Sequence, residues 1–337
     1  MRKFWLAAVC ALTLVGFAGC GNSMEKTQAS SPAAASKDAV SILNSQYKLK
    51  HLVKDAQAPK VYFTKDISPE GLVKIYEALG QKVDGKVGIK LSFETPNGPY
   101  IKPAMLKPLR DKVNGVFIDS NGFTPPRNTT AGHLQVAKQH GFMDVGPVDI
   151  LDAEGDIDMP VNGKYLKFHR TGSHFKDYDT LISIVNFKPH YLPVYGGTTK
   201  NLTICLGSIA GKANIHSAGK TLSGYSPASK DAQTEAFAEA VEAAVNYKKD
   251  KWVYINILAG MNYKDKCKDI RDLKDVGILA STDPIAVDQA AIDFTYGQAA
   301  TDSLRAEWED NHWSSILDVA EKRGVGKKNY SLTVINQ

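Results

Sequence analysis

The sequence predicts an α/β domain built on a mostly parallel or mixed sheet that is flanked by helices. Segments typical of strands alternate with segments typical of helices along residues 60–335, which favours a largely parallel sheet covered by helices. Residues 180–187 (TLISIVNF) are almost continuously apolar, as expected of a strand buried on both faces. The body of the chain, about 290 residues, is long enough for one large domain or for two lobes.

Three strands and three helices are predicted in the first half of the body. The strands span 60–64, 86–93 and 115–121, and the helices span 68–80, 103–113 and 129–141. The first helix has the clearest boundaries, because Ser68 is a typical N-cap, Pro69 suits the first turn and Gly80 favours the end. An acidic run at 152–158 lacks the glycine and the terminal glutamate of a calcium loop, so a solvated hairpin or loop is predicted there.

The second half of the body repeats the alternation. After the strand at 180–187, a helix at 228–248 carries its apolar residues, most of them alanines, on one face. Further strands are predicted at 252–258, 276–281 and 330–335, and a late helix at 314–322. Asp283 precedes Pro284 at the end of a predicted strand, and it is expected to cap the helix that begins there.

The N-terminus has the pattern of a bacterial lipoprotein signal. Arg2 and Lys3 precede an apolar segment, 4–17, that is short for a membrane span but suits a signal peptide. The segment ends in Phe17-Ala18-Gly19-Cys20, which resembles the lipobox in which the cysteine is acylated. We therefore expect a signal peptide at 1–19 and lipidation of Cys20. The alternative is an ordinary secretory signal with an incidental cysteine.

The residues that follow Cys20 have the composition of a flexible tether. Residues 22–39 are rich in Ser and Ala and show no periodic apolar pattern. The predicted organisation is a lipid-anchored tether at 20–45 and a single α/β domain at 46–337. Such a protein is exported and held on a membrane of the cell envelope. Gly21 after the cysteine resembles the signal for the outer membrane, if the cell is Gram-negative.

Charge and cysteine content exclude several classes of protein. Removal of Arg2 and Lys3 lowers the formal net charge from +5 to +3, which gives no support for a nucleic-acid partner. After loss of the signal and acylation of Cys20, the body retains Cys205 and Cys267. Two cysteines can form one disulfide in an oxidising compartment, but they cannot supply four thiolates for an iron–sulfur cluster or a Cys₄ zinc site.

Familiar catalytic and nucleotide-binding signatures are absent from the sequence. No Gly-x-Gly-x-x-Gly pattern follows a predicted strand, and there is no His-Glu-x-x-His or Gly-x-Ser-x-Gly. Gly207, Gly211 and Lys212 come one residue short of a P-loop, and Ala213 stands where that motif needs a hydroxyl. Dinucleotide enzymes, P-loop ATPases, common zinc proteases and standard esterases are therefore not favoured.

The most informative stretch is 186–216, which contains no Asp or Glu but gathers lysines, histidines, glycines and a cysteine. Such residues suit an anionic ligand, because ammonium groups and free backbone amides both bind anions. The candidate ligand-binding residues in this stretch are Lys188, His190, Gly196, Gly197, Lys200, Asn201, Gly211, Lys212 and His216. For 196–201 the alternative is a plain turn whose lysine is solvated.

Other residues are weaker candidates for the same site. Arg127 follows two prolines and could clamp an anion, the alternative being a surface arginine. Imidazole and thiolate suit zinc, copper or iron, so His190, His216 and Cys205 are candidate metal ligands, although their spacing matches no compact motif. His133 and His140 lie on one predicted helix and are interpreted as surface or packing histidines.

Polar residues also follow several predicted strands, where sites of open α/β sheets gather. These residues are Asp119, Ser120, Asn121, Lys188, Asn262, Ser281, Thr282 and Asp283. If the strands are neighbours and parallel, these side chains converge on one crevice. Asp283 is therefore a candidate ligand-binding residue as well as a helix cap.

Seven separated motifs carry a resemblance to a known family. They are VYFTKDIS (61–68), KVGIKLSF (86–93), FIDSNGFTPPR (117–127), HLQVAKQHGF (133–142), FKPHYLPVYGGTTKN (187–201), GSIAGKANIH (207–216) and GILASTDPIAVDQAAIDF (277–294). In this order they resemble the uncharacterised Fe–S center proteins, domain of unknown function family 362. The resemblance covers roughly 58–297. It implies an α/β domain of unsettled biochemical role and carries over the candidate residues of 186–216, with Asp283 beside them.

The chain departs from this family in its cysteines. Many members carry a ferredoxin-like module that binds an iron–sulfur cluster, whereas this sequence has no cysteine-rich segment. Members often show two close cysteines where Lys266-Cys267-Lys268 has one. No iron–sulfur cluster is therefore expected in this chain, and the sequence identifies no other cofactor.

Two functions remain open at this point. The first is an exported, lipid-anchored protein with a site for an anionic small ligand or cofactor, metal-assisted or redox in one version, whose status as an enzyme is undecided. The alternative is a non-catalytic lipoprotein that binds a solute or interacts with the cell envelope. In the alternative, Cys205 and Cys267 are joined and the lysines are solvated.

Overall fold

The computed structural model describes residues 32–188, 195–261, 273–303, 306 and 315–335. The predicted signal peptide and Cys20 lie outside these residues, as do His190, Asn262 and Cys267. Within the described part of the chain, no helix is both long enough and apolar enough to cross a membrane.

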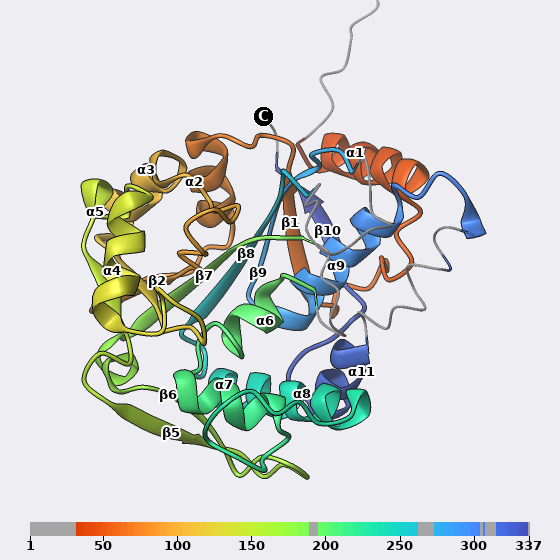
Figure 1. Cartoon of the computed structure of the whole chain (residues 1–337). Coiled ribbons are helices and arrows are strands. Elements are labelled where there is room, and N and C mark those ends of the chain that lie inside the picture. The colour runs from red at the N-terminus through yellow and green to blue at the C-terminus, as the bar shows by residue number, and fades with distance from the viewer. Residues whose placement is uncertain (1–31, 189–194, 262–272, 304–305, 307–314, 336–337) are drawn as a thin grey trace, which may run out of the picture.

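A mixed sheet forms the centre of the molecule, as the sequence predicts (Figure 1). Its strands lie in the order β10-β1-β9-β8-β7-β2-β3-β4. Their bounds are β1 Lys60–Thr64, β2 Val87–Lys90, β3 Val116–Asp119, β4 Val148–Ile150, β7 Thr180–Asn186, β8 Trp252–Leu258, β9 Gly277–Ser281 and β10 Ser331–Val334. Neighbouring strands pair in parallel except that β9 is antiparallel to both β8 and β1.

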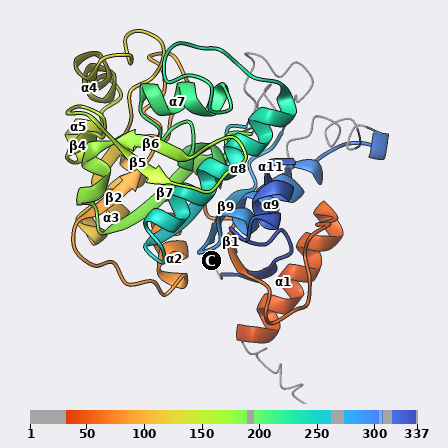
Figure 2. The same ribbon diagram turned by 90° about the horizontal axis from the view of Figure 1, so that it is seen from below.

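Helices cover both faces of this sheet (Figures 1 and 2). The described helices are α1 Pro32–Tyr47, α2 Pro69–Ala78, α3 Pro103–Val113, α4 Thr130–Gln139, α5 Phe142–Val145, α6 Thr198–Leu202, α7 Ile209–His216, α8 Lys230–Tyr247, α9 Pro284–Tyr296 and α11 Ser315–Lys322, with a 3₁₀ turn, η1, at Ser173–Asp177. In both views α3, α4 and α5 lie together and apart from α8, α9 and α11.

Two hydrophobic cores lie on the two sides of the sheet. Successive residues of a strand point to opposite faces, so Leu181 joins one core and Ile182 the other. The core that contains Leu181 packs against α8 and α9, and the core that contains Ile182 packs against α2 and α3. This arrangement confirms the predicted α/β class.

Local capping explains why α2 begins and ends where the sequence predicts. The Ser68 hydroxyl accepts a hydrogen bond from the Gly71 N–H (3.0 Å), and Pro69 occupies the first turn of α2. Gly80, with a φ of +64°, follows the C-cap Leu79 in the left-handed conformation that glycine adopts readily. The helix therefore begins and ends on residues whose local preferences agree with the fold.

Some elements differ from the prediction. The helix α1 begins inside the segment predicted as a tether, and Leu43 and Leu49 are buried in a core. The folded body therefore starts before residue 46, because this helix packs on β10 and α9. The acidic run at 152–158 leads into a hairpin of β5 (Asp156–Pro160) and β6 (Phe168–Gly172), in agreement with the hairpin alternative.

The cap of α9 is expected to make stability depend on pH. The Asp283 carboxylate accepts hydrogen bonds from the N–H groups of Ile285, Ala286 and Lys327, at 2.8, 2.9 and 3.0 Å. Burial raises the pKa of Asp283 to about 6 in spite of these bonds. A carboxyl whose pKa rises on folding holds more protons in the folded state, so its contribution to the free energy of unfolding falls as the pH rises from about 4 to about 6.

Asp283→Asn keeps a capping oxygen that does not ionise. We predict that the free energy of unfolding of the wild type, relative to this variant, falls by on the order of 2 kcal/mol between about pH 4 and about pH 6. Urea denaturation of both proteins across this range measures the difference. A difference that stays constant with pH would contradict the prediction.

Candidate functional site

Four neighbouring parallel strands end at the same edge of the sheet. These strands are β3, β2, β7 and β8, and their last residues are Asp119, Lys90, Asn186 and Leu258. The antiparallel strand β9 runs the other way, because Gly277 pairs with Leu258 whereas Ser281 pairs with Tyr254. The predicted convergence of strand ends is therefore wrong for Ser281, Thr282 and Asp283, which lie at the opposite edge.

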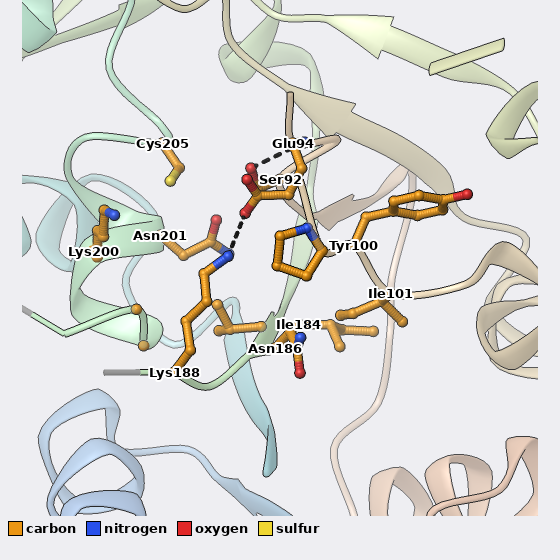
Figure 3. Close-up of a pocket in the computed structure, with 14 residues that line it drawn as sticks. Ser92, Glu94, Tyr100, Ile101, Ile184, Asn186, Lys188, Lys200, Asn201 and Cys205 are labelled. Carbon is orange, nitrogen blue, oxygen red and sulfur yellow. Dashed lines mark hydrogen bonds and ion pairs between the residues drawn. The ribbon is translucent and has the colours of Figure 1, made fainter. Parts of the chain in front are cut away.

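A pocket lies between the segments that follow β2 and β7 (Figure 3). It is lined by Ser92, Glu94, Pro99, Tyr100, Ile101, Ile184, Val185, Asn186, Lys188, Gly196, Gly197, Lys200, Asn201 and Cys205. After β2 the chain moves outward to β3, and after β7 it moves outward to β8 on the other side. The pocket is thus at a topological switch point, where open α/β sheets commonly bind ligands.

A short β-bridge places two of the predicted residues together. Lys188 and Gly196 exchange backbone hydrogen bonds of 3.0 and 2.8 Å, so the chain returns to the pocket after leaving it. A Cβ on Gly196 would lie 2.9 Å from Cγ of Lys188. The glycine therefore permits the close approach that holds the lysine stem against the bridge.

Lys200 is a cation of the pocket whose ammonium lacks a hydrogen-bond partner within the described part of the chain. Its side chain is partly exposed and lines the pocket beside Cys205 (Figure 3). Burial lowers the pKa of Lys200; Cys205 and Glu94 oppose this shift, whereas Lys188 and Arg127 add to it. Among the residues that the structure describes, none forms a hydrogen bond with the Lys200 ammonium. An anion in the pocket would supply that missing partner.

A buried polar network forms the floor beneath the pocket. The Lys90 ammonium is fully buried and donates to Asp119 (2.9 Å), to Asn201 (3.0 Å) and to the carbonyl of Leu91. Burial alone would raise the pKa of Asp119, but Lys90 and His133 outweigh it and hold the pKa far below its usual range. This pair fixes a charge-compensated floor at the ends of β2 and β3.

Asn201 has a structural role in this floor. Its amide nitrogen donates to the carbonyl of Lys90 (3.0 Å) and to the hydroxyl of Ser183 (2.9 Å), while its oxygen accepts from Lys90. Asn201 lines the pocket, as predicted, but its polar atoms already hold α6 on β2 and β7. We therefore regard it as a positioning residue for the neighbouring Lys200.

The backbone amides at 197–199 do not form an open cradle for a ligand. The N–H groups of Thr198 and Thr199 donate to the buried carboxylate of Asp288, at 2.8 and 2.7 Å. Tyr195 and Asn256 also donate to Asp288, at 2.9 and 2.7 Å. An internal carboxylate thus occupies the N-terminal end of α6, so the amides of Thr198 and Thr199 cannot take part in the predicted anion cradle.

Gly197 serves this internal contact. A Cβ on Gly197 would lie 2.5 Å from the ring of Tyr195 and 2.8 Å from Oδ1 of Asp288. Burial raises the pKa of Asp288, while the hydrogen bonds from Thr199, Asn256, Thr198 and Tyr195 oppose the shift. The glycine is needed because α6 packs this closely on α9.

The residues predicted on α7 lie outside the lining of the pocket. A Cβ on Gly211 would meet the carbonyl oxygen of Arg170 at 1.9 Å, so this glycine allows α7 to pack on β6. Lys212 is buried, which lowers its pKa to about 8, and its ammonium donates to the carbonyl of Gly207. Gly211 therefore serves the packing of α7 on β6, and the Lys212 ammonium is bound to a carbonyl inside the protein.

His216 packs among aromatic rings. Its neighbours are Phe123, Tyr225 and Phe237, and its Nδ1 is 3.5 Å from the side-chain oxygen of Gln233. Burial lowers the pKa of His216, which favours the neutral ring. No group of three or more His, Cys, Asp or Glu side chains suited to a metal occurs among the described residues. The predicted metal set of His190, His216 and Cys205 remains a prediction, since His190 lies outside them.

Arg127 lies near the pocket without lining it. Its guanidinium is close enough to influence the pKa of both Asp119 and Lys200, and its Nε is buried without a hydrogen bond to any described residue. Arg127 therefore adds positive potential behind Lys200. Its buried Nε argues against a fully solvated surface arginine, and its role as an anion clamp remains a prediction.

Two histidines interpreted as surface or packing residues support the site from behind. His133 is fully buried, with Nε2 3.4 Å from Oδ2 of Asp119. His140 lies 2.8 and 3.1 Å from the carbonyl oxygens of Phe93 and Pro96, and its ring stacks on Tyr100. These contacts confirm the packing alternative and fix the segment that carries Glu94.

Sequence reasoning missed several residues of the site. In the sequence, Lys90 and Ser92 belong to a predicted strand, and no local pattern marks Glu94 or Tyr100. The available signal was their position directly after β2, the neighbour of β7 in the sheet. That signal has meaning only once the pairing of these two distant strands is known.

A comparison with family models confirms the family resemblance. A family model described as "Domain of unknown function (DUF362)" matches residues 87–293. The chain is similar to the lactate racemase apoprotein from Thermoanaerobacterium thermosaccharolyticum, with 15% identity and a TM-score of 0.42 over 67% of this chain and 54% of that one. It is also similar to a protein from Thermotoga maritima, with 12% identity and a TM-score of 0.43 over 69% and 58%. No curated protein matches the chain.

The chain thus spans little more than half the length of these two structures. At such low identity and similarity, neither structure bears on the chemistry of the pocket described above.

Asp288 offers a test of the site's architecture. We predict that Asp288→Asn lowers the free energy of unfolding by about 3 kcal/mol, because the new amide group would face donors and leave buried N–H groups without acceptors. Urea denaturation measures the effect. Asp302→Asn, at an exposed carboxylate paired with Lys48, is the matched control and should leave stability unchanged. Equal stability of the two variants would contradict the role given to Asp288.

Proposed function

The chain belongs to the DUF362 family, whose name assigns no activity, and from its pocket we propose that it binds a small anionic ligand at Lys200. We also propose that it does so as an exported protein anchored to the cell envelope through Cys20. The observation that carries the binding proposal is the Lys200 ammonium. It lines a pocket at a switch point of the sheet and has no hydrogen-bond partner among the described residues.

The electrostatics around Lys200 support this proposal. Lys188 lines the same pocket, and Arg127 lies close enough to influence the pKa of Lys200. Three cations in one region are costly to bring together unless negative charge compensates them. Glu94 and, near Arg127, Asp119 supply part of that charge, and a carboxylate or phosphate ligand would add to it.

The lining of the pocket also suits a small polar ligand. Asn186 and Ser92 offer polar side chains, while Ile101 and Ile184 provide an apolar wall opposite Lys200 (Figure 3). Charge-assisted hydrogen bonds would hold the anionic group, and the remaining walls would select its shape. The same pocket serves an enzyme or a solute-capturing lipoprotein, and our proposal concerns the binding step that both require.

Replacing Lys200 tests the binding proposal. We predict that Lys200→Met weakens binding of inorganic phosphate or oxalate by roughly 10- to 100-fold, since a hydrogen bond to a charged group contributes about 1.5–3 kcal/mol. Isothermal titration calorimetry of the purified protein at low salt measures the affinity. Lys74→Met, at an exposed lysine of α2, is the control. Binding that is equally strong in the wild type and both variants would exclude Lys200 as the anion contact.

Lipidation is tested separately from binding. We predict that Cys20→Ala abolishes incorporation of a labelled fatty acid and moves the protein from the membrane fraction to the soluble fraction of native-host cells, because the acyl chains supply the membrane affinity. Cys205→Ala is the matched control and should keep both label and location. A chain that is unlabelled and soluble before substitution would support the ordinary secretory signal instead.

A further inference from the structure

Glu94 projects into the pocket and forms an ion pair with one of its lysines. Oε1 of Glu94 lies 3.0 Å from Nζ of Lys188, and Figure 3 shows the two side chains meeting across the pocket. Glu94 also acts on the charge of Lys200, where it opposes the effect of burial on the pKa. The Glu94 carboxylate therefore acts on the charge of both lysines that line the pocket.

The backbone around Glu94 is held in an uncommon conformation. Glu94 has a φ of +61°, a left-handed value that residues with a Cβ adopt infrequently. The neighbouring residue Phe93 is fixed on both sides, because its N–H donates to Asp119 (3.0 Å) and its carbonyl faces Nδ1 of His140 (2.8 Å). These contacts fix the backbone from which the Glu94 side chain projects into the pocket, at the expense of backbone strain.

Two other carboxylates in this region also face positive groups, but they differ from Glu94 in exposure. Asp119 faces Lys90, and Asp288 faces the amides at the start of α6. The side chain of Asp119 is 2% exposed and Asp288 is fully buried, whereas the Glu94 side chain is 25% exposed. Of these three, Glu94 is the one that can leave its partner and enter solvent without opening the core.

We propose that Glu94 is a specificity-determining residue that acts as an internal competitor for the anionic ligand. Its carboxylate occupies Lys188 when the pocket is empty, and a carboxylate or phosphate group displaces it on binding. Weakly charged or neutral solutes cannot displace it. This inference rests on the binding proposed above and adds the reason why the pocket would favour strongly anionic groups.

Removing the charge of Glu94 tests this proposal. Glu94→Gln keeps the size of the side chain and should bind inorganic phosphate and oxalate about three- to tenfold more tightly than the wild type, because the ligand no longer competes with a like charge. Acetate, with one negative charge, should also bind more tightly, so the ratio of the oxalate affinity to the acetate affinity should fall. Isothermal titration calorimetry at low salt measures all three affinities.

Three further variants serve as controls. Asn tolerates the left-handed conformation, so Glu94→Asn should fold and show the same gain if Glu94→Gln does not fold. Glu77→Gln removes a surface carboxylate paired with Lys112 and should leave the affinities unchanged. In a Lys188→Met background the gain from Glu94→Gln should shrink, since the contested cation is missing.

The possible outcomes test the competitor role of Glu94 separately from the proposed binding of an anion. Lys200-dependent binding that is unchanged or weaker in Glu94→Gln overturns the competitor role and leaves the binding proposal intact. An equal gain in the Lys188→Met background overturns the ion pair as the basis of competition. If neither the wild type nor Glu94→Gln binds any of the three anions, both proposals fail.

Discussion

The buried carboxylate of Asp288 is the contact on which the geometry of the pocket depends. It receives the first amides of α6, the hydroxyl of Tyr195 and the amide of Asn256, and thereby joins α9, β8 and the segment that returns to the sheet. A short helix such as α6 has little stability of its own. Its position is therefore set by these contacts, and the position of α6 in turn places Lys200 at the pocket.

Other charged groups of the site form ion pairs at different depths below the surface. Lys90 and Asp119 form a fully desolvated pair. The cost of removing both charges from water is offset by further hydrogen bonds, since Lys90 also donates to the carbonyl of Leu91 and Asp119 also accepts from the Phe93 N–H. Closer to the surface, Lys188 and Glu94 form a more exposed pair, and Lys200 has no hydrogen-bond partner within the described chain. From the interior outward, the cations of the site thus pass from a buried pair to a partly exposed pair and then to a lysine whose ammonium has no hydrogen-bond partner in the described chain.

The sequence predicted the features that local chemistry decides. The cap of α2 at Ser68, the buried strand at 180–187 and the position of Lys188 after that strand are all confirmed. The reversed direction of β9 could not be predicted, because it follows from pairing with β8 and β1 and not from its own residues. That one reversal moved Asp283 from the expected crevice to the opposite edge.

The sequence also could not distinguish an open anion site from one filled by the protein itself. The run from Gly196 to Asn201 has the amides and hydroxyls of an anion cradle, but Asp288, far along the chain, occupies it. Lys90 likewise looked like a residue of an ordinary strand, although it is fully buried against Asp119. Partners so distant in sequence leave no local pattern.

The topology of the sheet explains why the pocket forms where it does. The chain leaves β2 toward β3 and leaves β7 toward β8, so the segments after these adjacent strands diverge and cannot cover the gap between them. Glu94 enters this gap from one side, and Lys188 and Lys200 enter it from the other. Opposite charges meet there because two diverging connections bring them together, so the switch point of the sheet is the origin of the pocket and of the ion pair within it.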